Sequence, residues 1–246
     1  MRRNEERLAS FLYPDPAEFA VDRPSQNGVL APSFTHGQAD GLQTFPTQTW
    51  LPAGETQRGT LLRTNGDPQT PLLPSKPYVD PVRLTHEELR SSGVIPRIPV
   101  MPIGYADAEK IMSVMDGVEV PVPLLFRLDV HGRLVRSTIK NVVAKFVGEQ
   151  EPDKWVLLTN HVDAWTKGAV DPSSGTAVML ELARVVSETS RQTGWRPRRS
   201  LVFCAFDAEE FGLIGSTEYV EEMLKTLQQR AVAVLNVDNI NGHALG

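Results

Sequence analysis

From about residue 135 onward, apolar runs alternate with amphipathic segments, and this alternation limits the chain to few folds. The apolar runs are STIKNVVAKFVG (137–148), KWVLLTNHVDAW (154–165), RSLVFCAFDAEE (199–210) and AVAVLNVD (231–238). Between them, SSGTAVMLELARVVSETS (173–190) predicts a helix whose apolar positions are Ala177, Leu180, Leu182, Val185 and Val186. STEYVEEMLKTLQQR (216–230) predicts a second helix, with Ser216 as its N-cap. Strands that alternate with helices indicate an α/β fold with a largely parallel sheet.

The first half of the chain has a different composition. Sixteen of the 19 prolines precede residue 125, and residues 14–82 are rich in loop-forming residues, which favours loops and short edge strands. A helix is expected at about 106–115, and alternating strands are expected around a turn at His131 and Gly132. We therefore divide the chain into residues 1–134 and residues 135–246.

Charge and composition exclude several classes of protein. The net charge of −5, with no basic stripe, argues against a nucleic-acid surface. Cys204 is the single cysteine, so no disulfide can form within the chain, and its apolar strand predicts a buried, inert thiol. No apolar run reaches the roughly 18 residues of a membrane span, and the N-terminus is a poor signal peptide.

Three of the predicted strands end on side chains that could bind a metal. One strand ends on His161 and Asp163, the next on Asp207, Glu209 and Glu210, and the last on Asp238, while Asp171 lies in the loop before a predicted helix. The carboxyl ends of parallel strands meet at one edge of a sheet. Carboxylates at such density repel one another unless cations hold them, so the sequence predicts a divalent metal site.

Histidine together with carboxylates suits zinc, or at some sites manganese or cobalt. Of the adjacent glutamates, one would bind metal and its neighbour would accept the proton of a metal-activated water, as in metallohydrolases. Each feature alone has a simpler structural interpretation: a satisfied histidine, a solvated helix start, or an aspartate that caps a helix. Their coincidence at three strand ends and one loop favours the metal.

These residues also carry a resemblance to a known family. The segments NHVDAWTKGAVDPSSGTAVMLELAR, GWRPRRSLVFCAFDAEEFGLIGSTEYVEE and LNVDN closely resemble the glutamate carboxypeptidase II-like branch of the co-catalytic zinc peptidases. That branch includes N-acetylated-alpha-linked acidic dipeptidases, prostate-specific membrane antigen and the non-enzymatic transferrin receptors. Upstream, LYPDPAEF, QRGTLLRTNGDPQTP and IPVMPIGYADAEKI resemble the family's protease-associated (apical) domain. The resemblance thus implies a partial, β-rich apical domain over 1–134 and the N-terminal part of an α/β zinc-peptidase domain over 135–246.

The resemblance implies a role for each residue of the candidate site. His161 and Asp238 would bind one zinc, Glu210 would bind a second, and Asp171 would bridge the two. Glu209 would be the general base, and Asp163 would orient the ligand histidine. A structural calcium would use Glu218 and Glu221 with loop oxygens near Thr70 and Leu73, although an acidic, solvated helix face explains the two glutamates nearly as well.

The resemblance also indicates what is missing from the sequence. The family's remaining zinc ligand, a histidine, would lie beyond Gly246, as would most substrate-binding residues and the helical domain through which members form homodimers. We therefore expect an incomplete fragment with at most one tightly held zinc and negligible peptidase activity. The family suggests a type II plasma-membrane protein with an extracellular catalytic domain, but this chain has no anchor of its own.

Three functions stay open at this point. The first is hydrolysis of a terminal peptide bond, by a carboxypeptidase or a dipeptidase type of activity that the sequence does not decide. The second is a non-catalytic binding module of the transferrin-receptor kind, against which the complete set of His161, Asp171, Glu209, Glu210 and Asp238 argues. The third is an inactive, truncated isoform of an active enzyme.

Overall fold

The structure is a computed structural model, and it describes residues 59–96, 100–104, 106–107, 130–132 and 135–240. The chain divides into two compact units, one made of 1–58 and 96–134 and the other of 59–95 and 135–246. The first unit lies mostly outside the described residues. The predicted apical domain and the helix at 106–115 therefore stay predictions. The second unit contains the sheet, and it also takes in residues 59–95, which we had grouped with the N-terminal domain.

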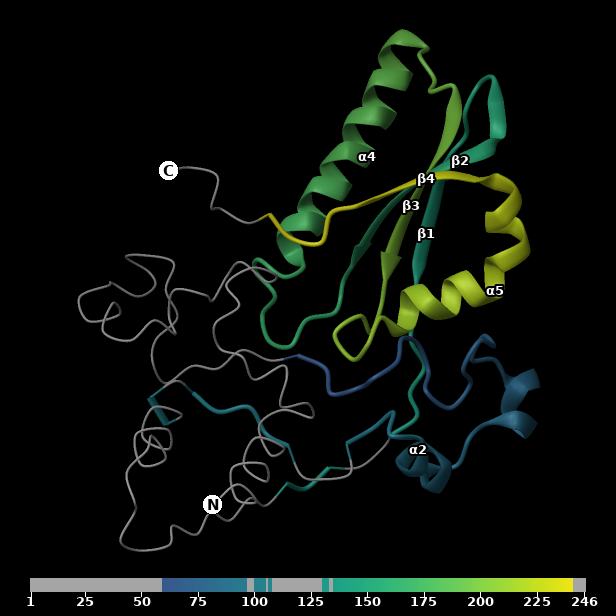
Figure 1. Cartoon of the computed structure of the whole chain (residues 1–246). Helices are drawn as coiled ribbons and strands as arrows, with labels where there is room; N and C mark the ends of the chain where they lie inside the picture. Colours follow the sequence, from purple (N-terminus) through teal and green to yellow (C-terminus); the bar gives the residue numbers. More distant parts are fainter. Residues whose placement is uncertain (1–58, 97–99, 105, 108–129, 133–134, 241–246) are drawn as a thin grey trace, which may run out of the picture. The chain divides into compact units, whose positions relative to one another are not determined.

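A four-stranded mixed sheet forms the centre of the second unit (Figure 1). Its strands are β1 (Val142–Phe146), β2 (Glu151–His161), β3 (Arg199–Phe206) and β4 (Ala231–Asn236), in the spatial order β1-β3-β2-β4. β2 pairs in parallel with both β3 and β4, whereas β1 pairs antiparallel with β3. The predicted α/β fold with a largely parallel sheet is confirmed in these residues.

Two helices pack on the sheet, as Figure 1 shows: α4 (Ser173–Thr193) lies on one side and α5 (Ile214–Arg230) on the other. The remaining elements of the unit are the 3₁₀ helix η2 (Pro77–Val82) and the short helix α2 (His86–Ser92). Thr85 and Glu88 form a capping box at the start of α2. Among the described residues, no helix is long and apolar enough to cross a membrane.

The core lies between the sheet and α5. Leu157 from β2 and Val202, Cys204 and Phe206 from β3 are almost fully buried, and Tyr219 of α5 packs against them. The rings of Phe206 and Tyr219 have centroids 5.6 Å apart. Cys204 is free and buried, as predicted, and burial raises the pKa of its thiol to about 11, which makes it inert at neutral pH.

The structure corrects two predictions about the helices. The stripe of α4 that turns toward the sheet is Gly175, Met179, Ala183 and Val186, spaced at i, i+4, i+8 and i+11. Val186 is the only buried residue among the five positions predicted to form the apolar face. The other four positions are exposed, because they lie beside this stripe on the helix surface and not within it. Ser216 is not the N-cap of α5: the helix begins at Ile214 after Leu213, and the Ser216 hydroxyl donates back to the Leu213 carbonyl.

The strand register brings the carboxyl ends of three strands level with one another. His161 of β2 lies opposite Phe206 of β3, and Thr159 of β2 lies opposite Asn236 of β4. The residues that follow these positions therefore emerge at the same edge of the sheet. This edge carries the candidate site.

Candidate metal centre

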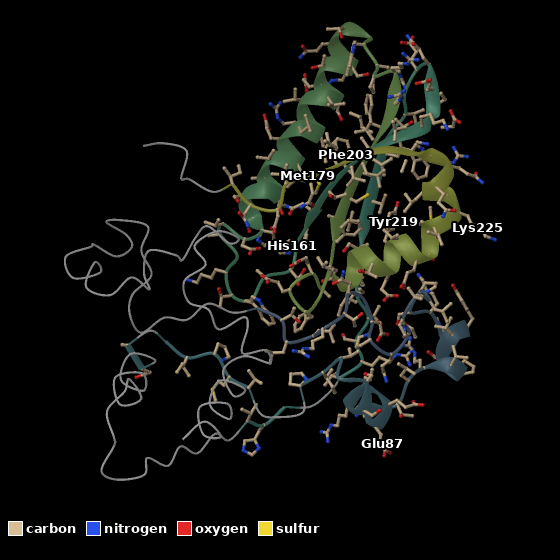
Figure 2. The ribbon with its side chains drawn as sticks, in the orientation of Figure 1. Glu87, His161, Met179, Phe203, Tyr219 and Lys225 are labelled. Atoms are coloured by element: carbon tan, nitrogen blue, oxygen red, sulfur yellow. The ribbon has the colours of Figure 1, made fainter. Side chains whose placement is uncertain are left out.

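His161 is the last residue of β2 and the most enclosed member of the site, with 4% of its surface exposed. Figure 2 shows it at the edge of the sheet near the first turn of α4. A buried amide supports its backbone: Asn160 Oδ1 accepts from the His161 N–H at 2.7 Å, and Asn160 Nδ2 donates to Thr176 Oγ1 at 2.7 Å. Thr176 Oγ1 in turn donates to the His161 carbonyl at 3.2 Å. This network fixes where β2 ends.

The two ring nitrogens of His161 have different partners. Nδ1 lies 3.0 Å from the backbone carbonyl of Asp163, which can only accept, so Nδ1 carries a proton. Nε2 then faces acceptors alone: Asp238 Oδ1 at 2.9 Å, Asp171 Oδ1 at 3.0 Å and Glu209 Oε2 at 3.7 Å. Such a geometry requires a cation at this point, either a second proton on the ring or a metal ion.

The charges of the site shift the pKa values of its members. Burial alone would lower the pKa of His161, but the carboxylates of Glu209, Asp238 and Asp171 outweigh it and raise the pKa. Burial raises the pKa of Glu209, and the nearby carboxylates raise it further against the opposing effect of His161. These shifts all point to an excess of negative charge around the imidazole.

Asp171 and Asp238 reach His161 from two different elements. Asp171 lies in the loop before α4, and Asp238 follows β4 by two residues. Gly175 in the first turn of α4 makes the approach possible, because a Cβ there would collide with the backbone carbonyls of Val237 and Asp238. One ligand atom each from His161, Asp171 and Asp238 lie within 4.8 Å of one another, so this trio could hold one metal ion.

The loop after β3 carries the two predicted glutamates, and Asp163 holds it in place. Asp163 Oδ1 accepts from the Glu209 N–H at 2.8 Å, and Oδ2 accepts from the Glu210 N–H at 3.2 Å. Glu210 lies outside the trio that could bind one metal, and its Oε1 accepts from the Trp165 N–H at 3.3 Å. Burial, with Asp171 nearby, raises the pKa of Glu210 to about 6.

The placement of Asp163 differs in detail from the one expected. Its carboxylate lies 3.5 Å from His161 Nδ1, farther than its own backbone carbonyl at 3.0 Å. The main partners of the carboxylate are the N–H groups of Glu209 and Glu210. Asp163 thus contacts the histidine ring through its backbone carbonyl and the glutamate loop through its side chain.

Asp207 is the one acid at the strand ends whose hydrogen bonds direct it away from the site. Its Oδ2 accepts from the Lys140 N–H at 2.9 Å, and its Oδ1 accepts from the Ala208 N–H at 2.9 Å. Asp207 therefore stabilises the turn after β3, the structural role that an aspartate at the end of a strand commonly has.

The residues predicted to bind calcium lie on α5 and in a loop that Glu218 of α5 contacts. Glu218 is buried and accepts from the backbone N–H groups of Asp67, at 2.7 Å, and of Ser75. Two buried oxygens of the predicted set, Thr70 Oγ1 and Glu221 Oε2, have no hydrogen-bond partner among the described residues. Leu73 lies in the same loop, where its N–H donates to the Thr70 carbonyl at 3.0 Å. Burial, and then the charge of Glu218, raises the pKa of Glu221.

A cavity of about 380 Å³ adjoins the site between α5 and the strands β2 and β4. His161, Glu209 and Asp238 line one part of it, and apolar side chains such as Leu157 and Val234 line the rest. The cleft thus combines an apolar wall with a cluster of carboxylates.

Sequence reasoning missed several residues that support the site. Asn160, Thr176 and Trp165 were assigned no role, yet all three contact the backbone or side chain of a predicted site residue. One signal was present for Asn160. A polar residue in an otherwise apolar strand is costly unless hydrogen bonds satisfy it, and Asn160 is only 1% exposed.

Comparison with known proteins shows what this chain is similar to. Residues 141–244 match the model of peptidase family M28. The chain is 42% identical over 257 residues to a glutamate carboxypeptidase 2 homolog from Caenorhabditis briggsae, which covers 96% of this chain and 31% of the relative. It is 46% identical over 206 residues to a probable glutamate carboxypeptidase, LAMP1, from Arabidopsis thaliana, and this match covers 80% of this chain and 30% of the relative. It is 40% identical over 223 residues to the aminopeptidase NAALADL1 from Mus musculus, and this match covers 80% of this chain and 29% of the relative.

The chain also matches part of several solved structures. A zinc aminopeptidase from Bacillus subtilis is 32% identical, with a TM-score of 0.36, over 41% of this chain and 24% of that protein.

Residues 141–244 are thus similar to the peptidase domain of family M28. More particularly, the chain is a relative of the glutamate carboxypeptidase II-like zinc peptidases, and it spans about a third of the length of these curated relatives, with 31% of the first one covered.

Proposed function

We propose that this chain contributes a metal-binding half-site and the general base of a zinc exopeptidase that hydrolyses a terminal peptide bond. The observation that carries the proposal is the His161 ring, whose Nδ1 donates to a carbonyl while Nε2 faces the carboxylates of Asp171 and Asp238 at 3.0 and 2.9 Å. His161, Asp171 and Asp238 would hold the ion. One imidazole and two carboxylates leave a fourth position free, as catalytic zinc sites do.

Each residue then has a defined task. When bound, zinc would polarise the peptide carbonyl and lower the pKa of a water molecule in the cleft. Glu209, whose carboxylate lies 3.7 Å from His161 Nε2, would accept a proton from the attacking water and deliver it to the leaving amine. Its raised pKa suits this task, because a base that must also release a proton works best near the operating pH.

Other residues position these groups. The Asp163 carbonyl fixes the tautomer of His161, and the Asp163 carboxylate holds the backbone of Glu209 and Glu210. Glu210 would bind a second zinc together with Asp171, which would then bridge the two ions. The nearby charge of Asp171, which raises the pKa of Glu210, supports this second site.

The substrate would be a peptide, as the family implies. The relatives include both carboxypeptidases and an aminopeptidase by name, so they do not decide which end of the peptide is cleaved. The apolar wall of the adjoining cavity supports binding of a peptide beside the carboxylates.

Zinc titration of the chain tests the proposal. The wild type should bind zinc, and His161→Ala should lose at least about tenfold in affinity, since it removes the only nitrogen ligand of the trio. His86→Ala is the matched control, because His86 is exposed at the start of α2. Equal zinc affinity in the wild type and His161→Ala would disprove the proposed site.

We further propose that Glu218, Glu221 and the loop around Thr70 and Leu73 bind a structural calcium. Thr70 Oγ1 and Glu221 Oε2 support it: both are buried and lack a hydrogen-bond partner in the part of the chain that the structure describes, and such oxygens are costly and suit a hard cation. Calcium should therefore raise the thermal midpoint of the wild type. Glu221→Gln should abolish that increase, whereas Glu222→Gln, which removes a surface ion pair with Lys76, should preserve it. Absence of any calcium effect on the wild type would contradict this proposal.

A further inference from the structure

The loop that carries Glu209 and Glu210 has an unfavourable backbone. Ala208 and Leu213, at its two ends, have positive φ values of 57° and 55°, and Gly212 has φ of 130°. Residues other than glycine rarely adopt such angles, and they keep them only where the surroundings hold the chain in place. Something must therefore fix this loop.

Part of the support comes from residues 59–66. Thr60 Oγ1 donates to the Phe211 carbonyl at 2.8 Å, and the Gly66 N–H donates to the Gly212 carbonyl at 2.9 Å. Both contacts hold the backbone of Phe211 and Gly212, the two residues that follow the glutamates in the chain.

The support on the carboxylate side comes from the loop after β2. Asp163 accepts from the N–H groups of both glutamates, and the Trp165 N–H donates to Glu210 Oε1. All three contacts depend on the position of residues 163–165. These residues lie beyond the end of β2, so the sheet does not fix them.

The indole of Trp165 is the part of this segment that packs against the glutamate loop. Its ring contacts Phe211, with centroids 5.1 Å apart and an interplanar angle of 61°, an edge-to-face arrangement. Its Nε1 is buried and has no hydrogen-bond partner among the described residues. The indole is therefore held by packing, and Phe211 directly follows Glu210.

We infer that Trp165 is a positioning residue: its packing against Phe211 locks the loop after β2 to the loop after β3 and thereby orients Glu209 and Glu210. The inference rests on the proposed function for the meaning of those two glutamates, but the lock itself is a property of the metal-free chain. If Trp165 merely stabilised the fold, its loss would destabilise the whole sheet. If it positions the glutamates, its loss destabilises only the loop that carries Glu209 and Glu210.

Hydrogen exchange of backbone amides in the metal-free chain separates these two outcomes. In Trp165→Ala the Glu209 and Glu210 amides should exchange about tenfold faster, because their Asp163 acceptor is no longer held. The amides of Val202, Phe203 and Cys204 in β3 should keep their wild-type rates. Trp165→Phe, which retains an aromatic edge for Phe211, should restore slow exchange of the two glutamate amides.

Trp195→Ala is the matched control, because Trp195 follows the end of α4 and is 48% exposed. It should leave the exchange of Glu209 and Glu210 unchanged. Unchanged exchange in Trp165→Ala, or acceleration that extends equally through β3, would overturn the inference. Failure of Trp165→Phe to restore slow exchange would overturn it too.

A zinc titration of the same variants gives a second readout. The Asp163 carbonyl also holds His161 Nδ1, so loosening residues 163–165 should weaken zinc binding about tenfold in Trp165→Ala and leave Trp165→Phe near the wild type. Equal zinc affinity in Trp165→Ala and the wild type would count against the inference. If His161→Ala bound zinc as tightly as the wild type, the proposed metal site would fail, and the exchange data would still decide the role of Trp165.

Discussion

At the scale of single residues, the hydrogen bond from His161 Nδ1 to the Asp163 carbonyl has the largest consequence. It fixes the tautomer of the ring and leaves Nε2 to face Asp171 and Asp238. The sequence predicted His161 as a metal ligand, and the family resemblance implied Asp163 as its orienting partner. It could not show that the backbone of Asp163 makes the closer contact, because that depends on how the chain turns after β2.

Glu209→Gln tests the role of the general base. In a protein of the relatives' full length, the variant should retain zinc and the fold but lose about 10²- to 10⁴-fold in turnover, since an amide cannot accept the proton. Peptide hydrolysis and zinc content should be measured on the same preparation. Turnover close to that of the wild type would remove Glu209 from this role.

The raised pKa of Glu210 predicts a specific dependence of stability on pH. A folded-state pKa of about 6, above the ordinary 4.5, means that the folded chain binds this proton more tightly than the unfolded chain does. The resulting stabilisation is complete below pH 4.5 and is lost as pH rises through about 6. Glu210→Gln, which never ionises, should avoid this loss.

Urea unfolding of the metal-free wild type and Glu210→Gln at a series of pH values measures the effect. The variant should gain stability relative to the wild type from pH 4.5 to about 6, and the difference should level off above that range. Comparing the two proteins at each pH cancels the contributions that the other acids make to the free energy of unfolding. A difference that is constant with pH would show that Glu210 has an ordinary pKa in the folded chain.

At the scale of elements, the site depends on how strand ends and helix starts meet. The strands were predictable because apolar runs end on polar residues, and the parallel register then aligns those ends. The start of α5 was not predictable. Ser216 has the chemistry of an N-cap, but the N-cap position falls three residues earlier, on Leu213, which adopts a left-handed conformation at the end of the glutamate loop.

Gly175 connects α4 to the metal centre, and Gly175→Ala tests this connection. An added Cβ would collide with the backbone carbonyls of Val237 and Asp238, so the strand end must shift. We expect a loss of about 1–3 kcal/mol in the free energy of unfolding, as for overpacking, together with weaker zinc binding. Chemical unfolding and zinc titration measure the two effects.

Gly194→Ala is the control for this prediction. Gly194 ends α4 with φ of 74°, and nothing lies within 4 Å of the position where a Cβ would be added. The substitution should cost about 1 kcal/mol from backbone strain and leave zinc affinity unchanged. If Gly175→Ala bound zinc as tightly as Gly194→Ala, the close approach at Gly175 would not position Asp238.

At the scale of the whole molecule, the sequence predicted the α/β fold of residues 135–240. Residues 59–95 share a compact unit with the sheet, through contacts such as the hydrogen bond from the Asp67 N–H to Glu218. A boundary drawn from proline content could not detect this, because composition reports local flexibility and not long-range pairing. The division at residue 134 therefore stays a prediction.

The 246-residue chain should bind one zinc tightly. Among the described residues, only His161, Asp171 and Asp238 bring three potential ligand atoms within 4.8 Å of one another. Glu210 with Asp171 offers two carboxylates, which should hold a second ion much more weakly. Elemental analysis after extensive dialysis should therefore give close to one zinc per chain, and a value of two would mean that another residue completes a second site.

Anomalous diffraction at the zinc edge, from crystals of the zinc-loaded chain, tests the central claim most directly. We expect a strong anomalous peak about 2.0–2.2 Å from His161 Nε2 and from one carboxylate oxygen each of Asp171 and Asp238. The Nδ1 of His161 should still donate to the Asp163 carbonyl. A zinc ion bound elsewhere, with no peak between these three side chains, would contradict it.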